Sequence, residues 1–100
     1  MGWEMYSISW RQHPVGHGGF HTGQALDHDG ARLTWIFDCG ARSGLEFATY
    51  LRNWTRAHQD PIDWLFVSHF DTDHANGLET LMSRAVVHDV MLPYVNDHEL

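Results

Sequence analysis

The sequence contains no lysine and a single cysteine, Cys39. One cysteine cannot form an internal disulfide, so we expect a protein of a reducing, cytoplasmic compartment rather than a secreted one. Six arginines stand against thirteen acidic residues, and the formal charge of −7 argues against a protein that coats DNA or RNA electrostatically. The apolar runs, such as 64–67 and 86–92, are too short to span a bilayer, so we expect no membrane partner.

Apolar and aromatic residues are abundant instead. Of the 100 residues, 43% are apolar and 13% aromatic, whereas only 19% are charged, a balance typical of a folded chain rather than a disordered one. The length allows one small domain, and no internal repeat or linker divides it. Histidine and aspartate are unusually frequent, with nine of each. Both side chains bind metal ions, so a metal site is the first function to look for.

Hydrophobic patterning predicts the element order β-β-β-α-β-α-β, which is an α/β fold with partly parallel strands. Alternation or short apolar runs predict five strands, at residues 3–10, 20–26, 33–37, 64–68 and 85–92. The sequence Asp-His-Asp-Gly at 27–30 is a turn of the kind that joins antiparallel strands. The continuous apolar run at 64–68 predicts a strand buried on both faces.

Two helices are predicted between these strands. Apolar side chains at i, i+3, i+4 and i+7 define one face of the first helix, and they are Phe47, Tyr50, Leu51 and Trp54. Ser43 and Glu46 have the spacing of a capping box at its start, and Asp60-Pro61 ends it. A second, shorter helix is expected at 78–84, with its leucines and Met82 turned inward.

The loop between the fourth strand and the second helix carries the densest group of potential metal ligands. Within six positions it presents His69, Asp71, Asp73 and His74. Binding sites of open α/β sheets form just beyond the carboxyl ends of strands, where this loop lies. We therefore expect these four residues to bind metal, and a purely structural polar turn is the alternative. An EF-hand loop counted from Asp71 is excluded, because Asn76 and Met82 stand where it requires glycine and glutamate.

The same loop resembles a known motif. The run His69-Phe70-Asp71-Thr72-Asp73-His74 is similar to the H-x-H-x-D-H motif of the metallo-β-lactamase fold hydrolases, with Asp71 in place of the second histidine. This H-x-D-x-D-H variant resembles that of ComEC-like hydrolases. Asp38-Cys39-Gly40 resembles the D-x-G segment of the family, and the glycine-rich stretch 15–20 resembles the hairpin opening of ComEC-like members.

The resemblance implies both a fold and a chemistry. It implies a four-layer αββα sandwich, of which residues 1–100 form the N-terminal part, as one domain that is incomplete by itself. One or two divalent metal ions at the edge of the sandwich would activate a water molecule. His69 and Asp71 would bind the first ion, and Asp73 and His74 the second. Asp73 would also orient or deprotonate the water as the catalytic residue, and Asp38 would support the ligands from behind.

The carboxylate of Asp71 bears on the expected metal and substrate. A carboxylate in place of an imidazole hardens the donor set, so we expect zinc or manganese, with magnesium or iron as further candidates. The ComEC-like variant implies a phosphodiesterase or nuclease rather than an enzyme that degrades β-lactams. A thioester, ester or amide substrate is the alternative within the same fold. The alternative outside enzymology is a non-catalytic scaffold or regulatory subunit of a larger assembly, which keeps the fold and a structural metal.

Full members of the family supply further ligands well downstream of this motif, and no matching segment follows His74. We therefore expect the remainder of a longer polypeptide, or a partner chain, to complete the site. A nucleic acid or another phosphodiester is the expected substrate. Half a sandwich would also expose the inner face of its sheet.

Other reactive or bulky side chains are assigned structural roles. His13, His17 and His21 are expected in turns and strands, because Pro14 and the neighbouring glycines prevent a helix that would bring them together. Cys39 is expected to be a small buried residue rather than a reactive thiol. Four tryptophans are expected in the packed interior, namely Trp10, Trp35, Trp54 and Trp64.

Overall fold

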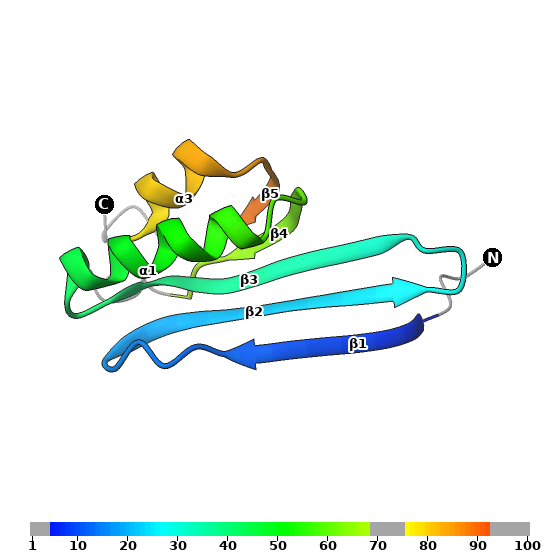
Figure 1. Cartoon of the computed structure of the whole chain (residues 1–100), viewed down its shortest axis with the longest axis horizontal. Helices are drawn as coiled ribbons and strands as arrows, with labels where there is room; N and C mark the ends of the chain where they lie inside the picture. The colour runs from blue at the N-terminus through cyan, green and yellow to red at the C-terminus, as the bar shows by residue number, and fades with distance from the viewer. Residues whose placement is uncertain (1–4, 69–75, 93–100) are drawn as a thin grey trace, which may run out of the picture.

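Three long strands open the fold, and helices and strands alternate after them (Figure 1). The computed structural model of the chain describes residues 5–68 and 76–92. The order of its elements confirms the predicted α/β arrangement β-β-β-α-β-α-β. The strands are β1 (Met5–Gln12), β2 (Gly18–Asp27), β3 (Arg32–Ala41), β4 (Ile62–Phe66) and β5 (Val87–Met91), and the helices are α1 (Gly44–Ala57) and α3 (Leu78–Arg84).

All five strands form one sheet, and their order across the sheet is their order along the chain. β1, β2 and β3 pair antiparallel, whereas β3, β4 and β5 pair parallel because a helix connects each strand to the next. The predicted turn joins β2 to β3. The Asp27 carboxylate accepts the N–H groups of Asp29 and Ala31 at 2.9 and 2.8 Å, and Gly30 has a φ of 86°, which favours glycine.

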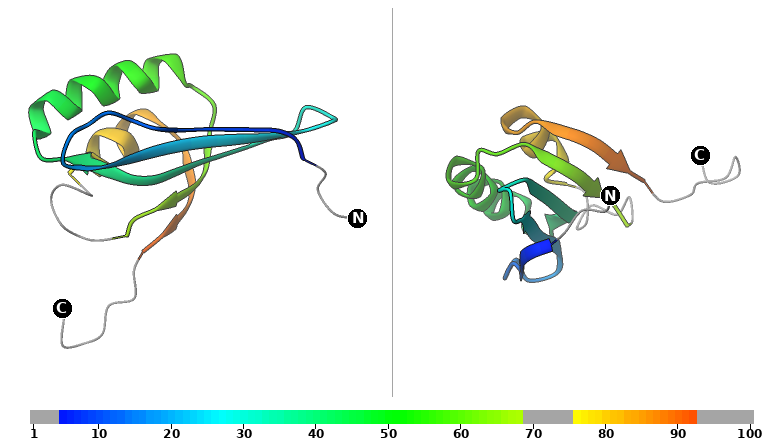
Figure 2. Two further views of the ribbon diagram at one scale, coloured as in Figure 1. Left: turned by 90° about the horizontal axis from the view of Figure 1, so that it is seen from below. Right: turned by 90° about the vertical axis from the view of Figure 1, so that its right-hand side faces the viewer.

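Both helices cover the same face of the sheet, where the core lies (Figure 2). The apolar face predicted for α1 is confirmed, because Phe47, Leu51 and Trp54 are buried. Phe20 of β2 lies between two of them, edge-to-face with Phe47 and with Trp54 at 5.4 Å between ring centroids in each case. The described sheet and its helices therefore form two packed layers, half of the predicted four-layer sandwich.

The start of α1 is at the predicted place, but the predicted capping box is wrong. Among the described residues, no side chain forms a capping hydrogen bond at Ser43. Ser43 and Glu46 are exposed, and the Ser43 carbonyl accepts the N–H of Phe47 at 3.0 Å. The burial of Phe47 against Phe20 fixes this first turn in place of a cap.

The bounds of α3 agree with the prediction, but one of its side chains does not. Leu81 is fully buried and Leu78 packs against the core, as expected. Met82 was expected to turn inward and is half exposed. A helix of only seven residues has a narrow contact with the sheet, which leaves no room for a third inward side chain.

The other face of the sheet carries large apolar side chains that are exposed in the described part of the chain. A hollow of about 570 Å³ on this face, called the open face below, is lined by Gln12, His21, Leu33, Trp35, Phe37, Trp64 and Phe66. Phe37 is 46% exposed and Trp64 36%, so the predicted burial of β4 on both faces is wrong. The helices cover one face only, and the exposure expected for half a sandwich is confirmed. Trp10 is also largely exposed, against prediction, and stacks on His21 beside this hollow.

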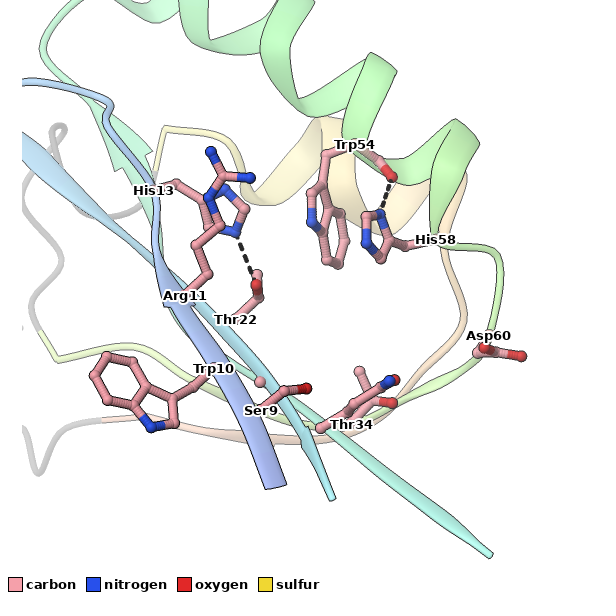
Figure 3. Close-up of a pocket in the computed structure, with 11 residues that line it drawn as sticks. Ser9, Trp10, Arg11, His13, Thr22, Thr34, Trp54, His58 and Asp60 are labelled. Atoms are coloured by element: carbon pink, nitrogen blue, oxygen red, sulfur yellow. Dashed lines mark hydrogen bonds between the residues drawn. The ribbon is translucent and has the colours of Figure 1, made fainter. Parts of the chain in front are cut away.

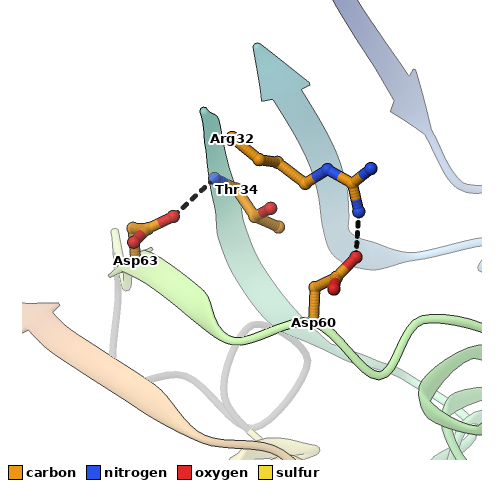
Figure 4. A network of polar contacts seen from close by, with 4 residues as sticks. All are labelled: Arg32, Thr34, Asp60 and Asp63. Atoms are coloured by element: carbon orange, nitrogen blue, oxygen red, sulfur yellow. Dashed lines mark hydrogen bonds and ion pairs between the residues drawn. The ribbon is translucent and has the colours of Figure 1, made fainter. Parts of the chain in front are cut away.

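Polar contacts fix the start of β4 against β3 (Figure 4). The Asp63 carboxylate accepts the N–H of Thr34 at 2.7 Å, and Asp60 forms an ion pair with Arg32. Within the parallel register that follows, Phe37 lies beside Phe66. The carboxyl ends of β3 and β4 therefore reach the same edge of the sheet.

Candidate metal centre

The four predicted ligands, His69, Asp71, Asp73 and His74, lie outside the described residues. Ser68 precedes this group and Asn76 follows it, and both residues are described. The structure therefore describes the candidate centre through the contacts of its two flanks, Ser68 before the loop and Asn76 with Gly77 after it. Both flanks are bonded to one stretch of β3, residues 38–41.

Asp38 holds the first flank. Its carboxylate accepts the backbone N–H of Ser68 at 2.7 Å and the Ser68 hydroxyl at 2.6 Å. Asp38 is 4% exposed and has a φ of 62°, a left-handed conformation that aspartate tolerates better than most residues. Charge-assisted bonds of this length are among the stronger ones in proteins. The residue directly before His69 is thereby attached to a buried carboxylate. The role of Asp38 in supporting the ligands stays a prediction.

Asn76 and Gly77 hold the second flank. The Asn76 side chain accepts the N–H of Ala41 at 3.0 Å through Oδ1 and donates to the Ala41 carbonyl at 2.6 Å through Nδ2. Gly77 donates its N–H to the Cys39 carbonyl at 2.8 Å. A Cβ atom at position 77 would lie 2.4 Å from Cε2 of Phe47 and 2.9 Å from the Cys39 oxygen, so this approach requires glycine.

Sequence reasoning missed Ser68 and Asn76 as parts of the site. The role of Ser68 cannot be recognised without its partner, Asp38, which lies thirty residues away in the sequence. The Asn-Gly pair before α3 was a usable signal, because a polar amide and a small residue at a helix start often mark a close backbone approach.

Cys39 lies next to this cluster and is confirmed as a buried, small core residue. Burial, together with the neighbouring Asp38 carboxylate, raises the pKa of its thiol to about 12. The thiol therefore stays protonated, which suits packing rather than nucleophilic or ligand chemistry.

The three N-terminal histidines lie in a turn and a strand region and do not form a cluster, as expected. His13 is 4% exposed and forms a hydrogen bond of 2.7 Å with the Thr22 hydroxyl group (Figure 3). Its other ring nitrogen forms a bond of the same length with the Tyr50 hydroxyl group. Burial, followed by the charge of Arg11, lowers its pKa to about 4. His13 is thus a neutral core residue, whereas His17 is exposed in the turn. This burial was not predictable from the local pattern, because Pro14 and nearby glycines are typical of an exposed turn.

Within residues 5–68 and 76–92, no group of three or more His, Cys, Asp or Glu side chains is placed to hold a metal ion. Outside those residues, the loop at 69–74 contains two imidazoles and two carboxylates, side chains that bind metal ions. Metal ligands have to be held in a defined arrangement. The attachment of both flanks to β3 would restrict the position of the loop in this way.

One comparison with known proteins identifies a family. A family model described as the metallo-beta-lactamase superfamily matches residues 22–95, a range that includes the loop and both flanks. No curated protein and no solved structure matched the chain. Neither of the two helices in the described ranges is long and apolar enough to cross a membrane.

Proposed function

Because the chain belongs to the metallo-beta-lactamase superfamily, we propose that it carries the metal loop of a hydrolase that cleaves phosphodiester bonds. The observation that carries the proposal is the attachment of Ser68 to the buried Asp38 carboxylate. It fixes the residue before His69 at the edge where β3 and β4 end. Ligand sites of α/β sheets form at such edges.

Each residue of the loop has a role in this proposal. His69 and Asp71 would hold one divalent ion, and Asp73 and His74 a second. When bound, such ions lower the pKa of a coordinated water toward neutrality and so supply the nucleophile. Asp73 would orient this water or accept its proton as the catalytic residue. Asp38 acts behind the ligands, through Ser68.

The donor chemistry supports the choice of substrate. Asp71 adds a second carboxylate to a loop that also contains Asp73, and hard oxygen ligands favour manganese, magnesium or iron beside zinc. The additional negative charge helps to hold two cations close together, and two cations stabilise the attacking and leaving oxygens of a phosphoryl displacement. A nucleic acid or another phosphodiester is therefore the proposed substrate class.

The open face supports a role for a further polypeptide. Phe37 and Trp64 line an apolar hollow that no other described residue covers. Apolar patches of this kind are typical of surfaces that pack against another layer. We propose that the remainder of a longer chain, or a partner chain, covers this face and supplies the other ligands. The same observation favours the second candidate function, a non-catalytic scaffold or regulatory subunit that binds its partner through this face.

Hydrolysis of bis(p-nitrophenyl) phosphate by the full native chain, with Mn²⁺ or Zn²⁺ added, tests the first function. We expect activity that depends on the metal and is abolished by Asp73→Ala and by His74→Ala. Asp29→Ala is the matched control, since Asp29 lies exposed in the β2–β3 turn, and it should retain full activity. A carboxylic ester and a β-lactam assayed in parallel would identify a different substrate class.

Retained activity in both loop variants would refute the mechanism. If the native chain hydrolyses none of these substrates, yet Phe37→Glu on the open face abolishes binding of its natural partner, the scaffold function is the better account. Phe37 is the suitable position because its side chain is exposed and contributes little to the folded core.

A further inference from the structure

The contact between Asn76 and Ala41 resembles the pairing of two strands. β3 pairs with β4 over Trp35 to Phe37. Farther along β3, Cys39 bonds to the backbone of Gly77, and Ala41 bonds to the side chain of Asn76. The amide of Asn76 thus continues the backbone ladder of β3 on the side where β4 lies.

A side-chain amide is well suited to this position. Ala41 presents one N–H and one carbonyl, and Asn and Gln are the side chains that offer both an acceptor and a donor in the geometry of a peptide group. The two bonds, at 3.0 and 2.6 Å, use Oδ1 and Nδ2 of Asn76 together. Ala41 is 2% exposed, so water has little access to its backbone if the amide is removed.

The position of this contact links it to the metal loop. Asn76 follows His74 by two residues, and Gly77 then begins the turn into α3. Ser68 and Asn76 are attached to Asp38 and Ala41, which lie three residues apart on β3, about 10 Å along an extended strand. Both residues that flank the segment with the four proposed ligands are therefore hydrogen-bonded to the same strand, β3.

We propose that Asn76 is a positioning residue for metal binding, acting through its paired hydrogen bonds to Ala41. The inference rests on the proposed metal loop and adds to it a residue that touches neither metal nor substrate. Loss of the pair leaves the Gly77 N–H as the described bond between this end of the loop and β3, so ions bind more weakly while the ligands themselves are unchanged. Outer residues that orient ligands commonly change metal affinity by about 10- to 100-fold.

The test is titration of the full native chain with Mn²⁺ alone, and then with Zn²⁺ alone, by isothermal calorimetry. Asn76→Ala should weaken binding at least about tenfold relative to the native chain. Two controls accompany it. Asn53→Ala removes an exposed asparagine of α1, and Ile62→Val trims a buried side chain at the far end of β4, about 13 Å along that strand from Phe66.

The controls separate positioning from stability. Ile62→Val lowers the melting temperature without touching the loop, so its metal affinity should equal that of the native chain. Native affinity in Asn76→Ala, or an equal loss in Ile62→Val, would overturn the inference. If Asn76→Ala fails to fold, Asn76→Ser carries the same test, since its shorter side chain cannot reach both polar groups of Ala41. A native chain that binds neither ion would refute the proposed function itself, and this inference with it.

Discussion

The burial of His13 predicts an acid-sensitive fold. In the folded chain the pKa of His13 is lowered to about 4 from its usual 6.5. Between these two values the unfolded chain binds a proton that the folded chain does not, so the free energy of unfolding falls as the pH is lowered from about 6.5 to about 4. Each pKa unit corresponds to about 1.4 kcal/mol, which gives a loss of about 2 kcal/mol at pH 5 and about 3 kcal/mol at pH 4.

The physical cause is visible around the ring. His13 lies among aromatic side chains, with Phe20 at 4.5 Å and Tyr50 at 5.6 Å between ring centroids. Both ring nitrogens are already bonded to hydroxyl groups, and Arg11 lies close enough to oppose a second positive charge. A protonated ring would therefore lose solvation without gaining an acidic partner from the part of the chain that the structure describes.

Urea unfolding at pH 7.5, 6, 5 and 4 measures this effect. His13→Gln keeps a donor and an acceptor for Thr22 and Tyr50 but cannot be protonated. The variant should be less stable than the native chain at pH 7.5, and the difference should shrink by about 2 kcal/mol at pH 5. Because the other titrating groups are common to both chains, they cancel in the difference. A difference that stays constant from pH 7.5 to pH 4 would refute the reasoning.

Three further predictions concern the cluster around β3. Gly77→Ala should destabilise the fold by about 1–3 kcal/mol in urea unfolding, because the new Cβ would lie 2.4 Å from Phe47. A change below about 0.5 kcal/mol would contradict that close approach. The Cys39 thiol, with its pKa raised to about 12, should react with iodoacetamide at pH 8 far more slowly in the native chain than in urea; equal rates would show that it is accessible. Asp38→Asn should lower the free energy of unfolding by about 1–2 kcal/mol, because its bonds to Ser68 lose the charge while Asn still tolerates the φ of 62°. An unchanged unfolding midpoint in that variant would mean that the carboxylate charge contributes nothing.

The elements of this fold were predictable because their signals are local. The spacing of Phe47, Leu51 and Trp54 identifies the inner face of α1 whatever the helix packs against. The observed bounds of the short helix at 78–84 are the predicted ones, because a polar loop precedes the helix and an extended apolar run follows it. What periodicity cannot reveal is how many faces of a sheet are covered. Trp64 lies in a run that is typical of two-sided burial, yet its side chain is exposed on the open face.

The candidate site also has a part that was predictable from local sequence and a part that was not. Its ligand chemistry lies within six consecutive residues and can be read from them directly. The contacts that support the loop join residues about thirty or more positions apart, Asp38 with Ser68 and Ala41 with Asn76. Both pairs depend on the register between β3 and the chain that follows α1, which no local pattern encodes. The ligand residues could therefore be proposed from the sequence, but their support required a structure.

The identity between strand order and chain order has a consequence for how the protein is made. Each new strand docks onto the strand synthesised just before it, so the sheet can grow in one direction as the chain leaves the ribosome. The two hairpins of β1, β2 and β3 close short loops and should form first, whereas β4 and β5 wait for their helices. Pulse-labelled hydrogen exchange should find early protection in Thr22 and Ile36, and a simultaneous onset in β5 would contradict this order. The apolar side chains of the open face are then exposed on the nascent chain as soon as β4 docks, and exposed surface of this kind favours aggregation of a chain that is still being synthesised.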